Sequence, residues 1–136
     1  MQGFSQQAIN GFRWFLIVCC VFRVLNAGFV LVFASWMVLP FYLIHMFGQI
    51  KMYSQSTISK TDKYLVYTST ILFLLATLFQ AEQDVHKSYY LIEYIVGKQF
   101  PTPDPFSSQY LIEFGWIFAA DIMINMYFIF KRSQSL

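Results

Sequence analysis

Charged residues are scarce in this sequence. Lys, Arg, Asp and Glu make up 12% of the 136 residues, whereas a soluble globular domain carries roughly 25%. So few charges cannot cover the surface of a folded chain, and we expect lipid or partner subunits to cover the apolar remainder. The net charge of +2 is small, and no Lys/Arg-rich run occurs. The composition therefore argues against a nucleic-acid-binding protein.

Cysteines and catalytic motifs are also lacking. The two cysteines, Cys19 and Cys20, are adjacent and could bridge only with strain, so we expect no structural disulfide. We interpret them as small apolar side chains, with a reactive or lipidated pair as the alternative. The sequence contains no glycine-rich phosphate loop, no G-x-S-x-G, no H-E-x-x-H and no C-x-x-C motif. We therefore expect no catalytic activity, no metal site and no cofactor.

Long apolar runs dominate what is present. Residues 27–47 include no residue that is charged at neutral pH, and similar runs occur at 64–81 and 110–130. About 20 apolar residues in a helix match the thickness of the hydrocarbon core. Hydrophobic residues make up 57% of the chain and aromatic residues 21%, which suits a bilayer and its headgroup region. The pattern predicts an all-α integral membrane protein, one domain of three to four transmembrane helices in a small bundle.

Helix breakers and caps set the expected boundaries. A stop at Asn26 to Gly28 separates the first two helices, and Pro40 is expected to kink the second. Thr61 and Asp104 are the expected N-caps of the last two spans, the second of which follows a Pro-rich loop at 100–106. Arg13 is the first basic residue, so the N-terminus does not read as a cleaved signal peptide. The expected helices are 8–26, 29–51, 62–81 and 105–131.

Residues 84–98 predict a further, amphipathic helix. Four apolar side chains recur at helical spacing, and Glu93 and Lys98 lie off this stripe. The stripe consists of Val85, Tyr89, Ile92 and Val96. We expect a short helix that lies on the outer membrane surface or docks on a partner.

The distribution of charge predicts the orientation. The connector at 48–63 holds three lysines and one aspartate, a net charge of +2, whereas 82–109 holds four acidic residues and two lysines, a net charge of −2. Lys131 and Arg132 lie at the C-terminal end of the last expected helix. Basic segments stay on the side that is not translocated. We therefore expect the connector and the C-terminus inside and 82–109 outside, with the N-terminus inside if the first helix is a separate span.

Asp121 is the most informative residue for a candidate site. It lies deep in the last span, with Asn125 one turn below it and Glu113 two turns above it. An ionisable group at that depth faces other helices or a cavity rather than lipid. We interpret it as a structural anchor whose hydrogen-bond donor is Arg23 or another chain. The alternative is a proton or ion relay, or a ligand contact.

Other residues of the spans give less specific signals. Gly115 and Ala119 form a small-xxx-small pair that would allow close helix packing. His45 and His86 are expected at opposite sides of the bilayer, so one haem iron could not bind both. We interpret His45 as an interfacial polar residue, with a single-histidine haem as the alternative. The hydroxyl groups of Ser69, Thr70 and Thr77 are expected to bond to backbone carbonyls of their own helix.

These observations predict a non-catalytic accessory subunit of a larger membrane complex, of the energy-transducing, respiratory kind. The expected location is the inner mitochondrial membrane or, as the alternative, a bacterial plasma membrane. The expected partners are the lipid bilayer, other membrane subunits and bound lipid, but not nucleic acid. Two rival functions stay open. One is a quinone- or haem-bearing membrane anchor of a respiratory enzyme, although the paired His and Arg signatures of such anchors are missing. The other is a small oligomeric channel or transporter built around Asp121.

Overall fold

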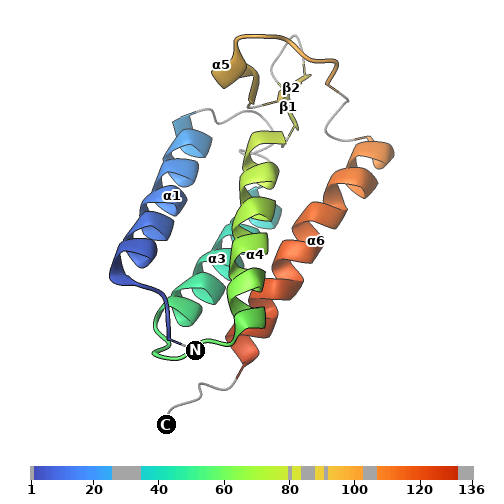
Figure 1. Cartoon of the computed structure of the whole chain (residues 1–136). Helices are drawn as coiled ribbons and strands as arrows, with labels where there is room; N and C mark the ends of the chain where they lie inside the picture. Colours follow the sequence, from blue (N-terminus) through green and yellow to red (C-terminus); the bar gives the residue numbers. More distant parts are fainter. Residues whose placement is uncertain are drawn as a thin grey trace.

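Four long helices form the body of the molecule. The computed structural model describes residues 2–25, 35–79, 81–83, 88–90, 92–102 and 107–131. Figure 1 shows the long helices side by side as a bundle. They are α1 (Gln6–Leu25), α3 (Ser35–Tyr53), α4 (Lys60–Phe79) and α6 (Ser108–Phe130). The described fold is therefore helical, with four long helices rather than three.

Shorter elements cover one end of the bundle. The strands β1 (Ala81–Gln83) and β2 (Ser88–Tyr90) pair antiparallel, with Ala81 opposite Tyr90, and α5 (Ile92–Val96) follows them (Figure 1). We call this end of the bundle the hairpin end. The opposite end, where residues 54–59 join α3 to α4, is called the connector end.

Where the structure describes them, the helix boundaries agree with the apolar runs to within a few residues, and one N-cap differs. The expected start of the second helix at 29 lies outside the described residues, and α3 is helical through Pro40. The N-cap of α4 is Ser59 rather than Thr61, because the Ser59 hydroxyl accepts a hydrogen bond from the backbone N–H of Asp62 at 3.1 Å. The last helix begins at Ser108, and the expected N-cap Asp104 lies outside the described residues.

The expected helix over 84–98 is not continuous, and residues 84–87 and 91 lie outside the described residues. Residues 88–90 form a strand, and the helix α5 has only five residues. Consecutive tyrosines at 89 and 90 favour a strand, and Gly97 ends α5 with a left-handed φ of 68°. The Glu93 carboxylate is hydrogen-bonded to its own segment. Its Oε1 accepts hydrogen bonds from Tyr90 N at 3.2 Å, Phe100 N at 3.3 Å and Thr102 Oγ1 at 3.0 Å. Val85 lies outside the described residues.

Helix α6 holds the bundle together. It packs most extensively against α3 and then against α4, whereas α1 makes closer contact with α4 than with α3. The tightest approach is at Gly48 of α3, where an added Cβ would lie 2.5 Å from Asn125 Oδ1 and 2.9 Å from Asn125 Cα. At Gly115, by contrast, an added Cβ would meet no described heavy atom within 4 Å. The close packing that we expected at Gly115 and Ala119 therefore occurs at Gly48.

Two apolar clusters fill the interior at different heights. The cluster near the hairpin end consists of Cys19, Phe41, Phe73 and Ala76, with Phe118 packed against it. The ring centroids of Phe41 and Phe118 are 4.4 Å apart. The cluster near the connector end consists of Ile9, Met52, Tyr53, Ile58, Val66 and Phe128.

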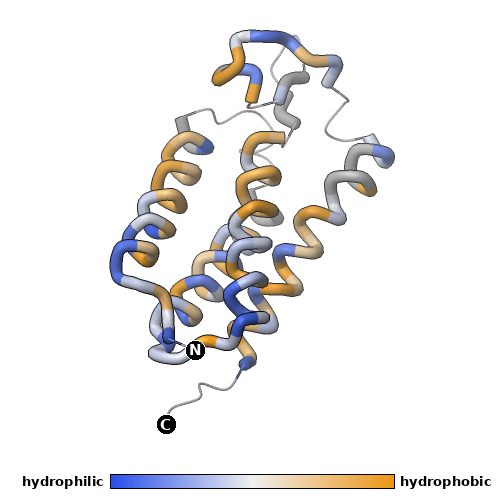
Figure 2. The backbone as a smooth tube through the Cα atoms, in the orientation of Figure 1, coloured by the Kyte–Doolittle hydropathy of each residue, from blue (hydrophilic) through white to orange (hydrophobic). Residues whose placement is uncertain are grey.

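By length and composition, α4 is long and apolar enough to cross a membrane, and the apolar part of α6, Gly115–Phe130, is somewhat shorter. Among the described helices, α4 is the one that meets this criterion. Figure 2 shows mostly apolar residues along the upper parts of α1 and α4 and more hydrophilic residues toward the connector end.

Candidate functional site

Buried polar residues gather between the two apolar clusters. They come from three helices, and each is at most 1% exposed. We call this group the polar cluster, and it consists of His45 and Gln49 of α3, Ser69 of α4, and Asp121 and Asn125 of α6.

Helical periodicity explains how the sequence builds the polar cluster. His45 and Gln49 are four residues apart, as are Asp121 and Asn125, so each pair lies on one face of its helix. Ser69 lies on the same face of α4 as the buried Val66 and Phe73. Because Gly48 allows α3 and α6 to approach closely, the two polar pairs meet.

Asp121 is the centre of the polar cluster. Its Oδ1 accepts hydrogen bonds from Ser69 Oγ at 2.5 Å and from Asn125 Nδ2 at 3.1 Å. Its Oδ2 lies 2.9 Å from His45 Nδ1, and a proton between these two atoms is needed for that contact. The His45 ring also stacks on Phe73, with centroids 4.0 Å apart. The carboxyl group therefore joins three helices.

The side-chain amides extend the network toward the connector end. Gln49 Nε2 donates to Ser69 Oγ at 2.9 Å and to Asn125 Oδ1 at 3.1 Å, and the Tyr53 hydroxyl donates to Gln49 Oε1 at 3.0 Å. Asn125 Nδ2 donates to Ser69 Oγ at 2.8 Å. The Ser69 hydroxyl thus accepts two hydrogen bonds and donates one, which is its full capacity. A fully bonded network of this kind rigidifies a core and favours one arrangement of its helices.

Apolar residues close the polar cluster at both ends. Phe41, Phe73 and Phe118 pack beyond His45 on the side of the hairpin end. Met52 and Phe128 are fully buried toward the connector end. The described residues therefore offer no continuous polar route along the bundle axis, and the geometry suits a structural network better than a conduit.

A second polar contact closes the connector end. Lys131, just after α6, forms an ion pair with Asp62 in the first turn of α4, and Tyr127 OH donates to Asp62 Oδ1 at 3.2 Å. Burial alone would lower the pKa of Lys131, but hydrogen bonds to Asp62 and Tyr127 raise it above its ordinary value. Lys51 Nζ donates to the carbonyl oxygens of Ile129 at 2.5 Å and Lys131 at 2.6 Å. Its positive charge stabilises the C-terminal end of α6.

The expected partner of Asp121 was wrong. The contacts to its carboxylate come from Ser69, Asn125 and His45, whereas Arg23 is buried beside Tyr42 near the hairpin end. His45 lies in the interior of the bundle, with its ring stacked on Phe73 and its Nδ1 bonded to Asp121. The side chain of Glu113 and the whole of His86 lie outside the described residues.

Sequence reasoning missed Gln49 and Ser69. Thr70 and Thr77 do donate to the carbonyl oxygens of Val66 at 2.8 Å and Phe73 at 2.9 Å, as expected, but the Ser69 hydroxyl instead bonds across the bundle. The signal that could have found Gln49 is its spacing of four residues from His45, which matches the spacing of Asp121 and Asn125.

Among the residues that the structure describes, no three His, Cys, Asp or Glu side chains lie close enough together to hold a metal ion. No protein-family model, no curated protein and no solved structure matches this chain.

Proposed function

We propose that this protein is a multi-pass membrane protein with four spans that serves as a non-catalytic subunit of a larger membrane complex. The observation that carries the proposal is the distribution of polarity, because polar side chains are buried beside the apolar clusters while many large apolar side chains are exposed. Among the residues that the structure describes, eight polar or charged side chains are buried, including all five of the polar cluster. Large apolar side chains are exposed on each long helix, for example Trp14, Phe47, Ile71 and Met123.

The exposed apolar surface supports the membrane location. Water-exposed apolar patches of such extent are rare on soluble monomers, whereas lipid covers them at no cost. The four long helices have 20, 19, 20 and 23 residues, and at 1.5 Å per residue each extends about 30 Å, which matches the hydrocarbon core. In lipid, buried polar side chains then help to hold the helices together.

The closed polar cluster supports a structural role. It joins α3, α4 and α6, and apolar residues seal it toward both ends of the bundle. The small size of the chain and its short extramembrane segments leave the outer faces of the spans as its main surface. We infer that those faces contact lipid and neighbouring subunits of an energy-transducing complex, in the inner mitochondrial membrane or a bacterial plasma membrane.

Thiol accessibility tests the four-span topology. Single cysteines replace Ser56, Ser107 or Ser133 in a variant that lacks Cys19 and Cys20, and intact membranes are treated with an impermeant thiol reagent. We expect labelling of Ser107→Cys from outside, and of the other two only after permeabilisation. The chain should also stay in the membrane after carbonate extraction. Release by carbonate, or the same accessibility at all three positions, would contradict the proposal.

Extraction in a gentle detergent, followed by a native gel and a visible spectrum, tests the role as a subunit. We expect the chain to migrate with a large assembly. A Soret band in the purified chain would favour the haem-bearing anchor instead, and migration as a homo-oligomer alone would favour a channel or transporter.

A further inference from the structure

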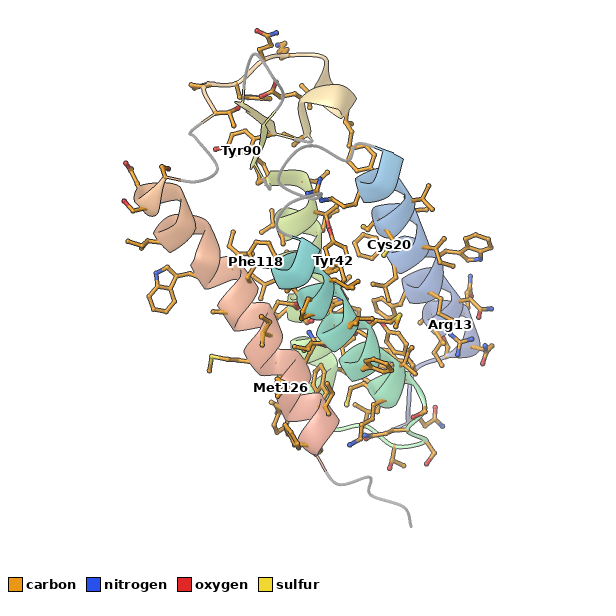
Figure 3. The ribbon with its side chains drawn as sticks, turned by 180° about the vertical axis from the view of Figure 1, so that it is seen from behind. Arg13, Cys20, Tyr42, Tyr90, Phe118 and Met126 are labelled. Carbon is orange, nitrogen blue, oxygen red and sulfur yellow. The ribbon has the colours of Figure 1, made fainter. Side chains whose placement is uncertain are left out.

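A long apolar groove lies between α1 and α3. Its volume is ≈ 810 Å³, which is within the range of ligand-binding cavities. Apolar side chains of both helices line most of it, and Tyr42 of α3 and Cys20 of α1 face it from its two walls (Figure 3). The apolar lining residues include Leu16, Ile17, Val21, Leu39, Leu43 and Met46. Several of them, such as Ile17 and Leu43, are exposed although they lie between two helices.

The loose packing of α1 creates this groove. The polar cluster and Gly48 draw α3, α4 and α6 together, but α1 contributes no residue to the polar cluster. Near the connector end α1 is fixed, since the ring of Phe12 stacks on that of Tyr53 with centroids 5.2 Å apart. Beyond this contact, the groove lies between α1 and α3, although Cys19 of α1 and Phe41 of α3 belong to the same buried cluster.

The length of the groove matches that of an acyl chain in one membrane leaflet. Arg13 and Arg23 both line it and are ten residues apart on α1, so they are separated by about 15 Å along the helix axis. This is half of a hydrocarbon core of about 30 Å. An acyl chain that enters beside Arg13 would therefore reach Arg23, near the hairpin end of α1.

The charge at the groove mouth indicates the kind of lipid. Arg13 is exposed and lies toward the connector end of α1 (Figure 3). The same end carries several lysines, namely Lys51, Lys60, Lys63 and Lys131. A long basic side chain near a helix end can extend its guanidinium to the headgroup region. Basic residues at that level attract anionic phospholipids.

We propose that the groove between α1 and α3 binds one anionic phospholipid, with an acyl chain along the groove and its phosphate at Arg13. The site rests on the proposed membrane location. It explains why a wide apolar groove persists beside a tightly packed three-helix core.

Native mass spectrometry of the delipidated full chain tests the site, with dioleoyl phosphatidylglycerol and dioleoyl phosphatidylcholine as probes. We expect one phosphatidylglycerol to bind about fivefold more tightly than phosphatidylcholine, the factor that about 1 kcal/mol per basic residue gives at an anionic surface. Arg13→Gln should remove this preference, whereas Lys60→Gln, at the same end but outside the groove, should keep it.

Filling the groove provides a second readout. Leu43→Trp and Ile17→Trp fill it from its two walls and should lower the binding of both lipids, whereas Val18→Trp, on α1 but outside the groove lining, should not. Circular dichroism checks that each variant is folded. Equal affinity of the wild type for the two lipids would overturn the proposal, as would unchanged binding by both filled variants. A copurified neutral quinone that phosphatidylglycerol does not displace, or a second copy cross-linked through Cys20, would also overturn it.

Carbonate extraction of the starting membranes separates the two proposals. If the chain is released, the membrane location itself fails. If the chain is retained but shows no lipid preference, the lipid site alone fails.

Discussion

Asp121 is tolerable inside an apolar bundle because its carboxyl group is fully bonded by side chains of three helices. Removing a buried carboxylate from water is costly, and a buried ion pair often adds little net stability. Its benefit is specificity, because only one register of α3, α4 and α6 satisfies Ser69, His45 and Asn125 together. This favours a structural role for Asp121 over a relay.

Substitutions at Asp121 test this role. Asp121→Asn should cost less than about 1 kcal/mol, because the amide oxygen can still accept from Ser69 and its NH₂ group can donate to His45 Nδ1 in the other tautomer. Asp121→Leu leaves several buried donors without an acceptor and should lower the free energy of unfolding by about 2 kcal/mol. Unfolding by SDS in mixed micelles measures both.

Met123→Leu is the matched control, since Met123 is exposed on the same helix. If Asp121→Asn is as unstable as Asp121→Leu, the charge itself is essential. If Asp121→Asn folds and assembles normally but abolishes transport by the complex, Asp121 acts as a relay, and the structural interpretation is wrong.

Gly48 and Gly115 form a matched pair for a test of helix packing. A Cβ at residue 48 would overlap the side chain and the backbone Cα of Asn125, so the neighbouring helix must move. Gly48→Ala should therefore destabilise the bundle by about 1–3 kcal/mol. Gly115→Ala meets open space and should stabilise α6 by about 0.5–1 kcal/mol, because alanine favours a helix. The same unfolding measurement compares them, and equal effects of the two substitutions would contradict the observed packing.

At the scale of elements, the long helices were predictable because hydropathy over about 20 residues depends on the sequence alone. Which helix faces contact one another within the bundle was not predictable from the sequence. The four-residue spacing of Asp121 and Asn125 shows which face of α6 is polar, but not that α3 presents His45 and Gln49 to it. That choice depends on the close approach at Gly48, which a small-residue motif alone does not indicate, since Gly115 looked the better candidate.

The hairpin end shows where periodicity misled the prediction. Val85, Tyr89, Ile92 and Val96 fit a helical repeat, yet their segment divides into a strand and a five-residue helix. Over so short a stretch, the hydrogen bonds that the Glu93 carboxylate accepts and the left-handed turn at Gly97 outweigh the repeat.

Glu93 should therefore order the turn between β2 and residue 102. Glu93→Ala removes the acceptor for the backbone N–H groups of Tyr90 and Phe100, and hydrogen exchange at both amides should accelerate. Glu93→Gln keeps an oxygen acceptor and should have a smaller effect. Lys98→Ala, in the same exposed segment, is the control. Unchanged exchange at both amides in Glu93→Ala would show that the carboxylate does not hold this turn.

At the scale of the whole molecule, apolar clusters and polar contacts share the interior, while further large apolar side chains face outward along the long helices. Two contacts link the helices at the connector end. Lys131 forms an ion pair with Asp62, and Gly3 N donates a hydrogen bond to Ser56 O at 2.8 Å. The hairpin end instead presents apolar side chains beyond the spans. In α5, Ile95 is 63% exposed and Val96 is 47% exposed. Hydrophilic residues precede α5 in the sequence. A partner subunit or the membrane surface would cover them.

Replacing both residues tests whether this end docks on a partner. When fully buried, an apolar side chain of this size contributes about 1.5–3 kcal/mol, so the double variant Ile95→Ser, Val96→Ser should lose most of its association with the large assembly on a native gel. In the proposed topology the spans insert independently of this end, so the variant should still resist carbonate extraction. Lys98→Ser with Gln99→Ser changes the same exposed segment without removing apolar area and should assemble normally. If the apolar double variant also assembles like the wild type, the hairpin end is not an interface, and the contacts with partners must come from the outer faces of the spans.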